Sequence, residues 1–357
     1  MRITGCTPLA TACPAGSRPR RRLAVAVAAL LCVALLLGGC GSDDDAPASE
    51  AKQAGTTSAF PATITQKLGA VTIEAEPKRV VALDYPSADN ALALGVVPIG
   101  MAEVSYVKGG VMAWTKAALG DRKPAIFNVD KGFPFETIAK LNPDVILATN
   151  AYPYIADGGN WDKLNAIAPV VGHVKAPGTD TWQQAVSQVG KALGRSAEAE
   201  QLTTDVESSI AKARTDHPEF AGKTVSFFNY LGTDGLYVIS SDKDFSIKFL
   251  KQLGFQGVTD TVAKMSGGPQ EGRVKVSPER YADLEADLLM GTSSLGPAQL
   301  DKLAKHPTFA KVPAVTRGAY IPFHVGQSTS MVQLSALSLP FAVDRLVPRM
   351  SQALAGN

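Results

Sequence analysis

An internal repeat constrains the fold of this chain more than any other feature. The segment Pro134 to Thr149, PFETIAKLNPDVILAT, aligns without a gap on Ser277 to Thr292, SPERYADLEADLLMGT. The identical positions are Glu136 and Glu279, Ala139 and Ala282, Leu141 and Leu284, Asp144 and Asp287, and Thr149 and Thr292. Each copy reads as a short helix, a turn and a buried strand. Two ordinary units can share this pattern by chance, but the repeat favours two similar α/β lobes.

The segments before the first copy also read as α/β structure. Arg79 to Leu83 is a continuous apolar run, which is typical of a strand buried on both faces. Ala88 to Leu94 suits a helix, and Val96 to Met101 reads as the next strand. With 357 residues, the chain is also longer than one compact core usually holds.

Two helices are expected between the copies of the repeat. Thr181 to Leu193 and Ser196 to Asp216 have helical periodicity, and the second would span about 30 Å. We therefore predict two Rossmann-like α/β lobes joined by one long rigid helix, with small hinge motion. The predicted boundaries are 61–178 for the first lobe, 179–217 for the interlobe helical segment and 218–357 for the second lobe.

The first forty residues read as an export signal. A basic stretch precedes the apolar run Leu23 to Leu37, which is shorter than the roughly 20 residues of a bilayer span. The sequence Leu37-Gly38-Gly39-Cys40 resembles the bacterial lipoprotein box, in which the cysteine becomes the lipidated first residue. We predict a signal peptide over 1–39, a flexible tether over 40–60, and anchoring by Cys40 to the outer face of the cell membrane. A stop-transfer helix with an idle cysteine is the alternative.

Cysteine placement and charge exclude other classes. The four cysteines, Cys6, Cys13, Cys32 and Cys40, all belong to the leader region, so the mature body is expected to form no internal disulfide. Beyond the five arginines of the leader, the chain carries 30 basic and 33 acidic residues. A mildly acidic body without a basic stripe argues against nucleic acid as a partner.

Catalytic motifs are missing from the sequence. It contains no G-x-S-x-G elbow, no phosphate-binding loop, no G-x-G-x-x-G turn and no H-E-x-x-H. We therefore expect no enzymatic activity, although an exported enzyme on two α/β lobes remains one alternative. A cell-envelope adhesin or sensor on the same fold is another.

Several stretches together resemble the class III solute-binding proteins of bacterial ABC importers, the group that captures ferric siderophores, haem and cobalamin. They are PKRVVALDYPSADNALALGVVPIG from Pro77, ETIAKLNPDVILA from Glu136, LNAIAPVV from Leu164, the interlobe helix, and SPERYADLEADLLM from Ser277. The resemblance covers nearly all of residues 60–355. It implies a monomeric receptor that holds its ligand in the cleft between two lobes and passes it to a permease dimer.

Within that group, the sequence looks most like the ferric-siderophore receptors of actinobacteria. Receptors for free metal ions cluster their ligands, whereas the histidines here, His173, His217, His306 and His324, are scattered. We therefore expect no metal site and no cofactor, with iron bound only as its chelate. Haem or cobalamin remains an alternative, and haem would need an axial donor such as Tyr85, Tyr152 or His324.

Aromatic residues follow the predicted strands, where ligands of α/β sheets bind. These candidate ligand-binding residues are Tyr85, Tyr106, Trp114, Tyr152, Tyr154 and Tyr230. Aromatic faces with a polar tip can hold a bulky amphipathic chelate. Each of them could instead cap the core of its lobe, and we interpret Trp161 and Trp182 as packing residues.

Polar candidates complete the predicted cleft. Arg273, in EGRVKVSPE, stands where siderophore receptors often present a guanidinium to an anionic ligand, although a solvent-facing arginine is the equal alternative. His324 and Gln327 follow the strand Ala319 to Phe323 and are weaker candidates. One arginine among several tyrosines leans towards a hydroxamate over a strongly anionic catecholate.

Glu136 and Glu279 are the paired carboxylates of the repeat. Each stands in the first turn of a predicted helix, where an acid interacts favourably with the helix dipole. The resemblance implies a further role, because in the family a glutamate at this position of each lobe engages arginines of the permease.

Overall fold

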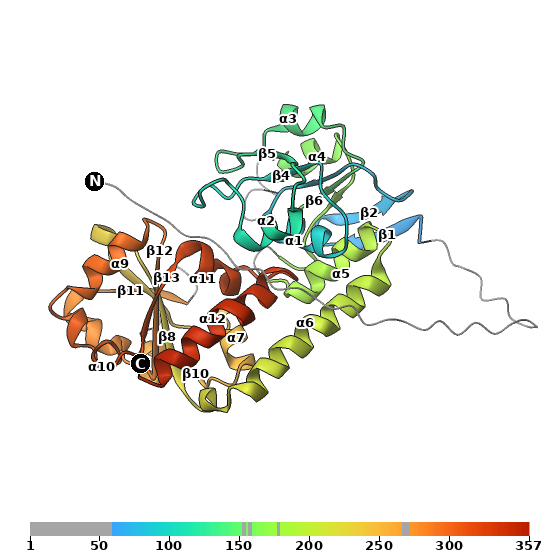
Figure 1. The fold of residues 1–357 in the computed structure, drawn as a ribbon. Coiled ribbons are helices and arrows are strands. Elements are labelled where there is room, and N and C mark those ends of the chain that lie inside the picture. Colours follow the sequence, from blue (N-terminus) through green and yellow to red (C-terminus); the bar gives the residue numbers. More distant parts are fainter. Residues whose placement is uncertain (1–58, 152–154, 156–158, 177–178, 266–271, 357) are drawn as a thin grey trace, which may run out of the picture. The chain divides into compact units, whose positions relative to one another are not determined.

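A computed structural model describes residues 59–151, 155, 159–176, 179–265 and 272–356 of the chain. Within the unit Thr56–Asn357, the strands form two large sheets, one in each half of the sequence (Figure 1). The predicted signal peptide, Cys40 and the tether up to residue 58 lie outside the described residues.

The first sheet is entirely parallel. Its strand order is β5-β4-β3-β6-β7, and the strands are β3 (Val80–Ala82), β4 (Gly100–Ala102), β5 (Ala125–Phe127), β6 (Val145–Leu147) and β7 (Val170–Val171). Every residue of the central strands β3 and β6 is buried, as expected for apolar runs covered on both faces. An antiparallel hairpin of β1 (Ala62–Gln66) and β2 (Gly69–Ile73) precedes this sheet.

The second sheet is mixed. Its order is β11-β9-β8-β12-β13, with β10 paired to β8, and the strands are β8 (Thr224–Tyr230), β9 (Leu236–Ile239), β10 (Gly257–Val258), β11 (Arg273–Val276), β12 (Leu288–Ser293) and β13 (Tyr320–His324). Strands β10, β12 and β13 run parallel to β8, whereas β9 is antiparallel to both β8 and β11. The predicted class, two α/β lobes, is confirmed.

Helices of the first half follow local signals in the sequence. They are α1 (Tyr85–Ala93), α2 (Ala113–Leu119), α3 (Phe135–Lys140) and α4 (Asn160–Asn165). Helix α1 begins after Asp84, whose carboxylate accepts the N–H of Ser87 at 2.7 Å, and Pro86 occupies its first turn.

Two long helices follow the first sheet, α5 (Trp182–Ala192) and α6 (Ser196–Asp216). Thr181 and Gln184 form a capping box that starts α5. The helices pack closely at Gly190, where an added Cβ atom would lie 2.4 Å from the Cβ of Ala199. Helix α6 has the 21 residues expected of the long connecting helix.

The second half contains six further α-helices and four short 3-10 helices among its described residues. The α-helices are α7 (Phe245–Gln252), α8 (Asp260–Ala263), α9 (Pro297–Ala304), α10 (Pro313–Thr316), α11 (Val325–Val332) and α12 (Ser338–Leu354). The 3-10 helices are η2 (Pro218–Phe220), η3 (Gly232–Asp234), η4 (Pro278–Leu284) and η5 (Phe309–Lys311). Within the described part of the chain, no helix combines the length and the apolar character that a membrane span requires.

The two copies of the repeat occupy equivalent places. Strands β6 and β12 each stand fourth in their sheet, beside β3 and β8. The carboxylate of Asp144 accepts the N–H of Arg79 at 3.0 Å, just before β3, and Asp287 accepts the N–H of Thr224 at 2.8 Å, at the start of β8. The copies differ in the type of helix with which they begin. The first begins with the α-helix α3 and the second with the 3-10 helix η4.

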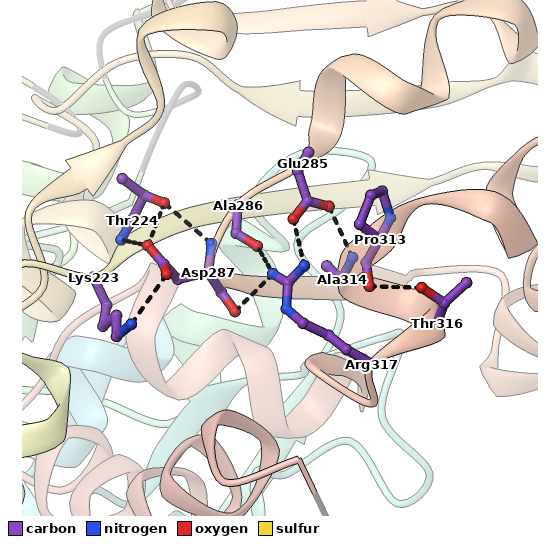
Figure 2. A network of polar contacts seen from close by, with 9 residues as sticks. All are labelled: Lys223, Thr224, Glu285, Ala286, Asp287, Pro313, Ala314, Thr316 and Arg317. Carbon is purple, nitrogen blue, oxygen red and sulfur yellow. Dashed lines mark hydrogen bonds and ion pairs between the residues drawn. The ribbon is translucent and has the colours of Figure 1, made fainter.

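Asp287 belongs to a wider network, which Figure 2 shows at close range. Its carboxylate also forms an ion pair with Lys223 at 3.2 Å. Partial burial raises its pKa, but the hydrogen bonds that it accepts from Thr224 and the nearby Lys223 lower the pKa further, so that the net shift is downward. Arg317, just after α10, donates to the backbone carbonyls of Ala286 and Asp287 and to the carboxylate of Glu285 (Figure 2). This network ties the start of β12 to its neighbours.

The link between α11 and α12 returns to the first lobe. Ser335 donates its hydroxyl to Asp89 of α1 at 2.7 Å, and the N–H of Ala336 donates to the side chain of Asn90 at 3.0 Å. All four residues are buried. One hydrophobic core extends through α5, α6 and α12 to both sheets, so the lobes are connected by packing as well as by α6.

Candidate ligand-binding cleft

A cleft of about 450 Å³ lies between the two lobes. The first lobe contributes the loops that follow β3, β4, β5 and β6, which meet at one edge because these strands are parallel. The second lobe contributes the edge strand β11, the start of α7 and the chain just after α11. Such a volume suits a small-molecule ligand.

Of the predicted ligand-binding residues that the structure describes, three line this cleft: Tyr85, Tyr106 and Arg273. Tyr85 is the first residue of α1 and is only 8% exposed. Burial raises its pKa well above the usual value, and the nearby Tyr106 adds to the shift. Its hydroxyl has no partner at hydrogen-bonding distance and angle among the described residues, although the Tyr106 phenol is close enough to interact with it. A buried hydroxyl in this state is suited to a ligand atom that accepts its hydrogen bond.

Tyr106 lies on the loop after β4 and is 42% exposed. Burial of its phenol raises its pKa, while Thr329 of α11 and Tyr85 act in the opposite direction. The next residue, Val107, places its Cγ2 atom 3.8 Å from where a Cβ atom would stand at Gly326 of α11. This loop of the first lobe therefore approaches the second lobe beside the cleft.

Arg273 reaches the cleft from the opposite side. It is the first residue of β11, pairs in register with Ile239 of β9, and is exposed. In the described part of the chain its guanidinium makes no ion pair. The sequence placed it just before a predicted strand or loop, whereas it is the first residue of β11, and its contact with a ligand stays a prediction.

Trp114, Tyr230 and His324 do not line the cleft. Trp114 lies in α2, not in a loop, and its indole N–H donates to the buried Asp89 at 2.6 Å. Tyr230 is the last residue of β8, and His324 caps α11. Tyr230 and His324 stand apart because the second lobe faces the cleft with its antiparallel edge strand β11, not with the carboxyl ends of β8 and β13. Tyr152 and Tyr154 lie outside the described residues.

Three helices begin at the cleft with the same kind of dipeptide, a polar N-cap followed by an aromatic residue. The sequence analysis did not identify this pattern. In each, a polar N-cap precedes an aromatic residue: Asp84 and Tyr85 in α1, Thr181 and Trp182 in α5, Asp244 and Phe245 in α7. The cap side chains satisfy the first N–H groups of the helices. Trp182, expected to serve packing alone, is 5% exposed and also lines the cleft. A polar cap followed by an aromatic residue was the signal available in the sequence.

Acidic residues are the second feature that the sequence reasoning missed. Glu103 and Asp130 follow β4 and β5 and both line the cleft. The side-chain amide of Asn128 donates to Glu103 at 3.0 Å and to Asp130 at 3.4 Å, which holds the two carboxylates on one wall. Asp180 lines the cleft as well.

Asp84 is the buried acid of the site. Burial raises its pKa from 3.8 to about 6, although hydrogen bonds from Ser87 and from the N–H of Asn150 oppose the shift. Asn150 in turn lies 3.5 Å from Gln333 of the second lobe, and both line the cleft. The carboxylate therefore organises the loops after β3 and β6 and has few lone pairs left for a ligand.

Glu136 and Glu279 lie away from the cleft and are exposed. They stand in the first turns of α3 and η4, the matching elements of the two repeat copies. Within the described ranges, no group of three or more histidine, cysteine or acidic side chains could hold a metal ion.

The chain matches the model of the family described as periplasmic binding protein over residues 80–321. It is 26% identical over 264 residues to "Probable siderophore-binding lipoprotein YfiY" of Bacillus subtilis, a match that covers 72% of this chain and 75% of that protein. Among solved structures, a periplasmic solute binding protein from Mycobacterium smegmatis superimposes with a TM-score of 0.71 at 29% identity, covering 82% of this chain and 98% of the other.

A second solved structure supports the fold alone. PiaA of Streptococcus pneumoniae, in complex with ferrichrome, gives a TM-score of 0.66 at 23% identity, covering 82% of this chain and 99% of that chain.

Proposed function

Because the chain belongs to the periplasmic binding protein family, we propose that it captures a ferric siderophore in the interlobe cleft and delivers it to an ABC importer. The cleft is the observation that supports this proposal. It has a volume of about 450 Å³, and both lobes line it with aromatic and polar side chains. The similarity to a lipoprotein named as siderophore-binding supports the same ligand class. The iron enters as its chelate, and the protein releases its ligand unchanged, without catalysis.

Fluorescence titration tests the proposal, because Trp182 lines the cleft and the other two tryptophans do not. The chain from Ser42 is titrated with a ferric hydroxamate, a ferric catecholate, haem and cobalamin in parallel. A ferric siderophore should quench the emission saturably. The variant Trp182→Phe should lose most of the quenching, while Trp161→Phe, the matched control on α4, should keep it. Silence with both siderophores, or chemical conversion of the ligand, would contradict the proposal.

We propose that Glu136 and Glu279 dock the receptor onto the permease. Their exposure and their matching positions in the repeat support this role, since one acid on each lobe suits a two-fold transporter. Replacing both by alanine should abolish siderophore uptake by cells and leave ligand affinity unchanged. The control Asp121→Ala changes another exposed acid of the first lobe. Intact uptake by the double variant would rule out the docking role.

The proposed location is the outer face of the cell membrane, with Cys40 as the lipidated residue. The leader sequence supports this proposal, as does the similarity to lipoproteins. Replacing Cys40 by serine should release the protein from the membrane fraction of labelled cells and abolish incorporation of a radiolabelled fatty acid.

A further inference from the structure

The charges of the cleft are unevenly divided. In the part of the chain that the structure describes, five carboxylates line it, from Asp84, Glu103, Asp130, Asp180 and Asp244, and one guanidinium, from Arg273. Among the residues that the structure describes, none of these five acids forms an ion pair with a lysine or arginine.

Three of the five acids accept hydrogen bonds from backbone N–H groups of the protein. Asp84 and Asp244 cap α1 and α7, so their charge is balanced by the N–H groups and the dipole of the helix that each one starts. Asp180 accepts the backbone N–H groups of Val174 and Lys175. These carboxylates therefore contribute little free charge to the cleft.

Glu103 and Asp130 are different, because neither caps a helix. Their hydrogen-bond partner is the neutral amide of Asn128, which bridges them and leaves most of their lone pairs free. Lys108 and Lys131 stand in the same loops but do not line the cleft. Two adjacent carboxylates without a counter-charge repel each other, and a cation between them would relieve that repulsion.

A second observation indicates that a ligand fills this cleft. In the described part of the chain, the hydroxyl of Tyr85 is buried without a hydrogen-bond partner of normal geometry, in a residue that is 8% exposed and lines the same cleft. A buried polar atom of this kind calls for a hydrogen-bond acceptor, and an oxygen of the ligand can supply it.

Ferric siderophores differ in charge by chemical class. Three hydroxamates neutralise the ferric ion, and a protonated amine elsewhere in the molecule makes such a chelate cationic. Three catecholates leave a strongly anionic complex, which the Glu103–Asp130 pair would repel. Building on the proposed function, we propose that this cleft selects cationic ferric trihydroxamates and that Glu103 and Asp130 receive the ammonium group of the ligand.

A pair of ligands matched in their iron centre tests this inference. The full-length protein in mild detergent is titrated with ferrioxamine B, which carries a free amine, and with its N-acetyl derivative, which does not. Acetylation should weaken binding about tenfold, the scale of a lost charge-assisted hydrogen bond. The difference should shrink as salt is raised, since the loop after β5 is open to solvent.

The double variant Glu103→Gln, Asp130→Asn should bind both ligands within about twofold of each other. The control Asp121→Asn changes an exposed acid outside the cleft and should retain the preference. Equal binding of the two ligands by the unaltered protein would overturn this inference and leave the proposed function standing. A preference for a ferric tricatecholate would likewise overturn the inference alone. Failure to bind any ferric siderophore would overturn both the inference and the proposed function.

Discussion

The buried carboxyl of Asp89 should make this protein less stable as the pH rises from about 4 to about 7. Asp89 has no exposed surface, and burial raises its pKa from 3.8 to about 7, although hydrogen bonds from Thr115, Ser335 and Trp114 oppose the shift. The folded protein therefore keeps a proton that the unfolded chain releases. This stabilisation is complete below pH 3.8 and is lost as the pH approaches 7. At about 1.4 kcal/mol per pKa unit, the loss is about 4 kcal/mol.

The variant Asp89→Asn isolates this effect because it is neutral at every pH. Its amide oxygen can accept from Trp114 and Ser335, while its NH₂ group donates to the hydroxyl of Thr115, which can rotate. We expect the free energy of unfolding of the variant, relative to the unaltered protein, to rise by about 3 kcal/mol between pH 5 and pH 8. Because both proteins share all other titrating groups, the comparison cancels their contributions.

Urea unfolding followed by fluorescence measures this difference on the chain from Ser42, which includes the unit Thr56–Asn357. The variant Asp89→Ala leaves the indole N–H of Trp114 without an acceptor. It should therefore be about 1–3 kcal/mol less stable than Asp89→Asn at both pH values. If the difference between Asp89→Asn and the unaltered protein were the same at pH 5 and pH 8, the argument from burial would be wrong.

Three further outcomes follow from the packing and the hydrogen bonds. Gly190→Ala should lower the free energy of unfolding by about 1–3 kcal/mol in urea titrations, because the new Cβ atom would meet Ala199 at 2.4 Å. Asp144→Ala and Asp287→Ala should each cost about 1–3 kcal/mol, since both leave backbone N–H groups at a strand start without their acceptor; a loss in only one lobe would refute their equivalence. Tyr85→Phe should change the free energy of unfolding by less than about 0.5 kcal/mol, because its hydroxyl has no hydrogen-bond partner of normal geometry among the described residues. It should nevertheless weaken ferric-siderophore binding, and unchanged affinity would show that the hydroxyl does not contact the ligand.

The repeat was sufficient to predict where the two lobes place their equivalent strands. Asp144 and Asp287 recur because each strand needs the same acceptor for the backbone beside it, and such a local requirement is visible in sequence. The 3-10 geometry of η4 was not predictable in this way, because its hydrophobic pattern fits either kind of helix.

The cleft was only partly predictable, because position after a strand does not say which way a side chain turns. Trp114 points into the core since Asp89, far away in sequence, provides the acceptor for its indole N–H. Glu103 and Asp130 follow their strands as the tyrosines do, but acids in loops are common on any surface. Two features of the structure distinguish Glu103 and Asp130 from ordinary surface acids. The side-chain amide of Asn128 bridges them, and both line the cleft that faces the second lobe.

The return of the α11–α12 link to the first lobe has a consequence for truncated genes. A stop codon shortly before Ser335 would remove only the end of the chain, yet it would deprive Asp89 and Asn90 of hydrogen-bond partners. It would also uncover the apolar surface that α12 shields. Loss of the last residues would thus damage the half of the protein that is synthesised first, and during translation the core of that half would close only after the final residues had been added.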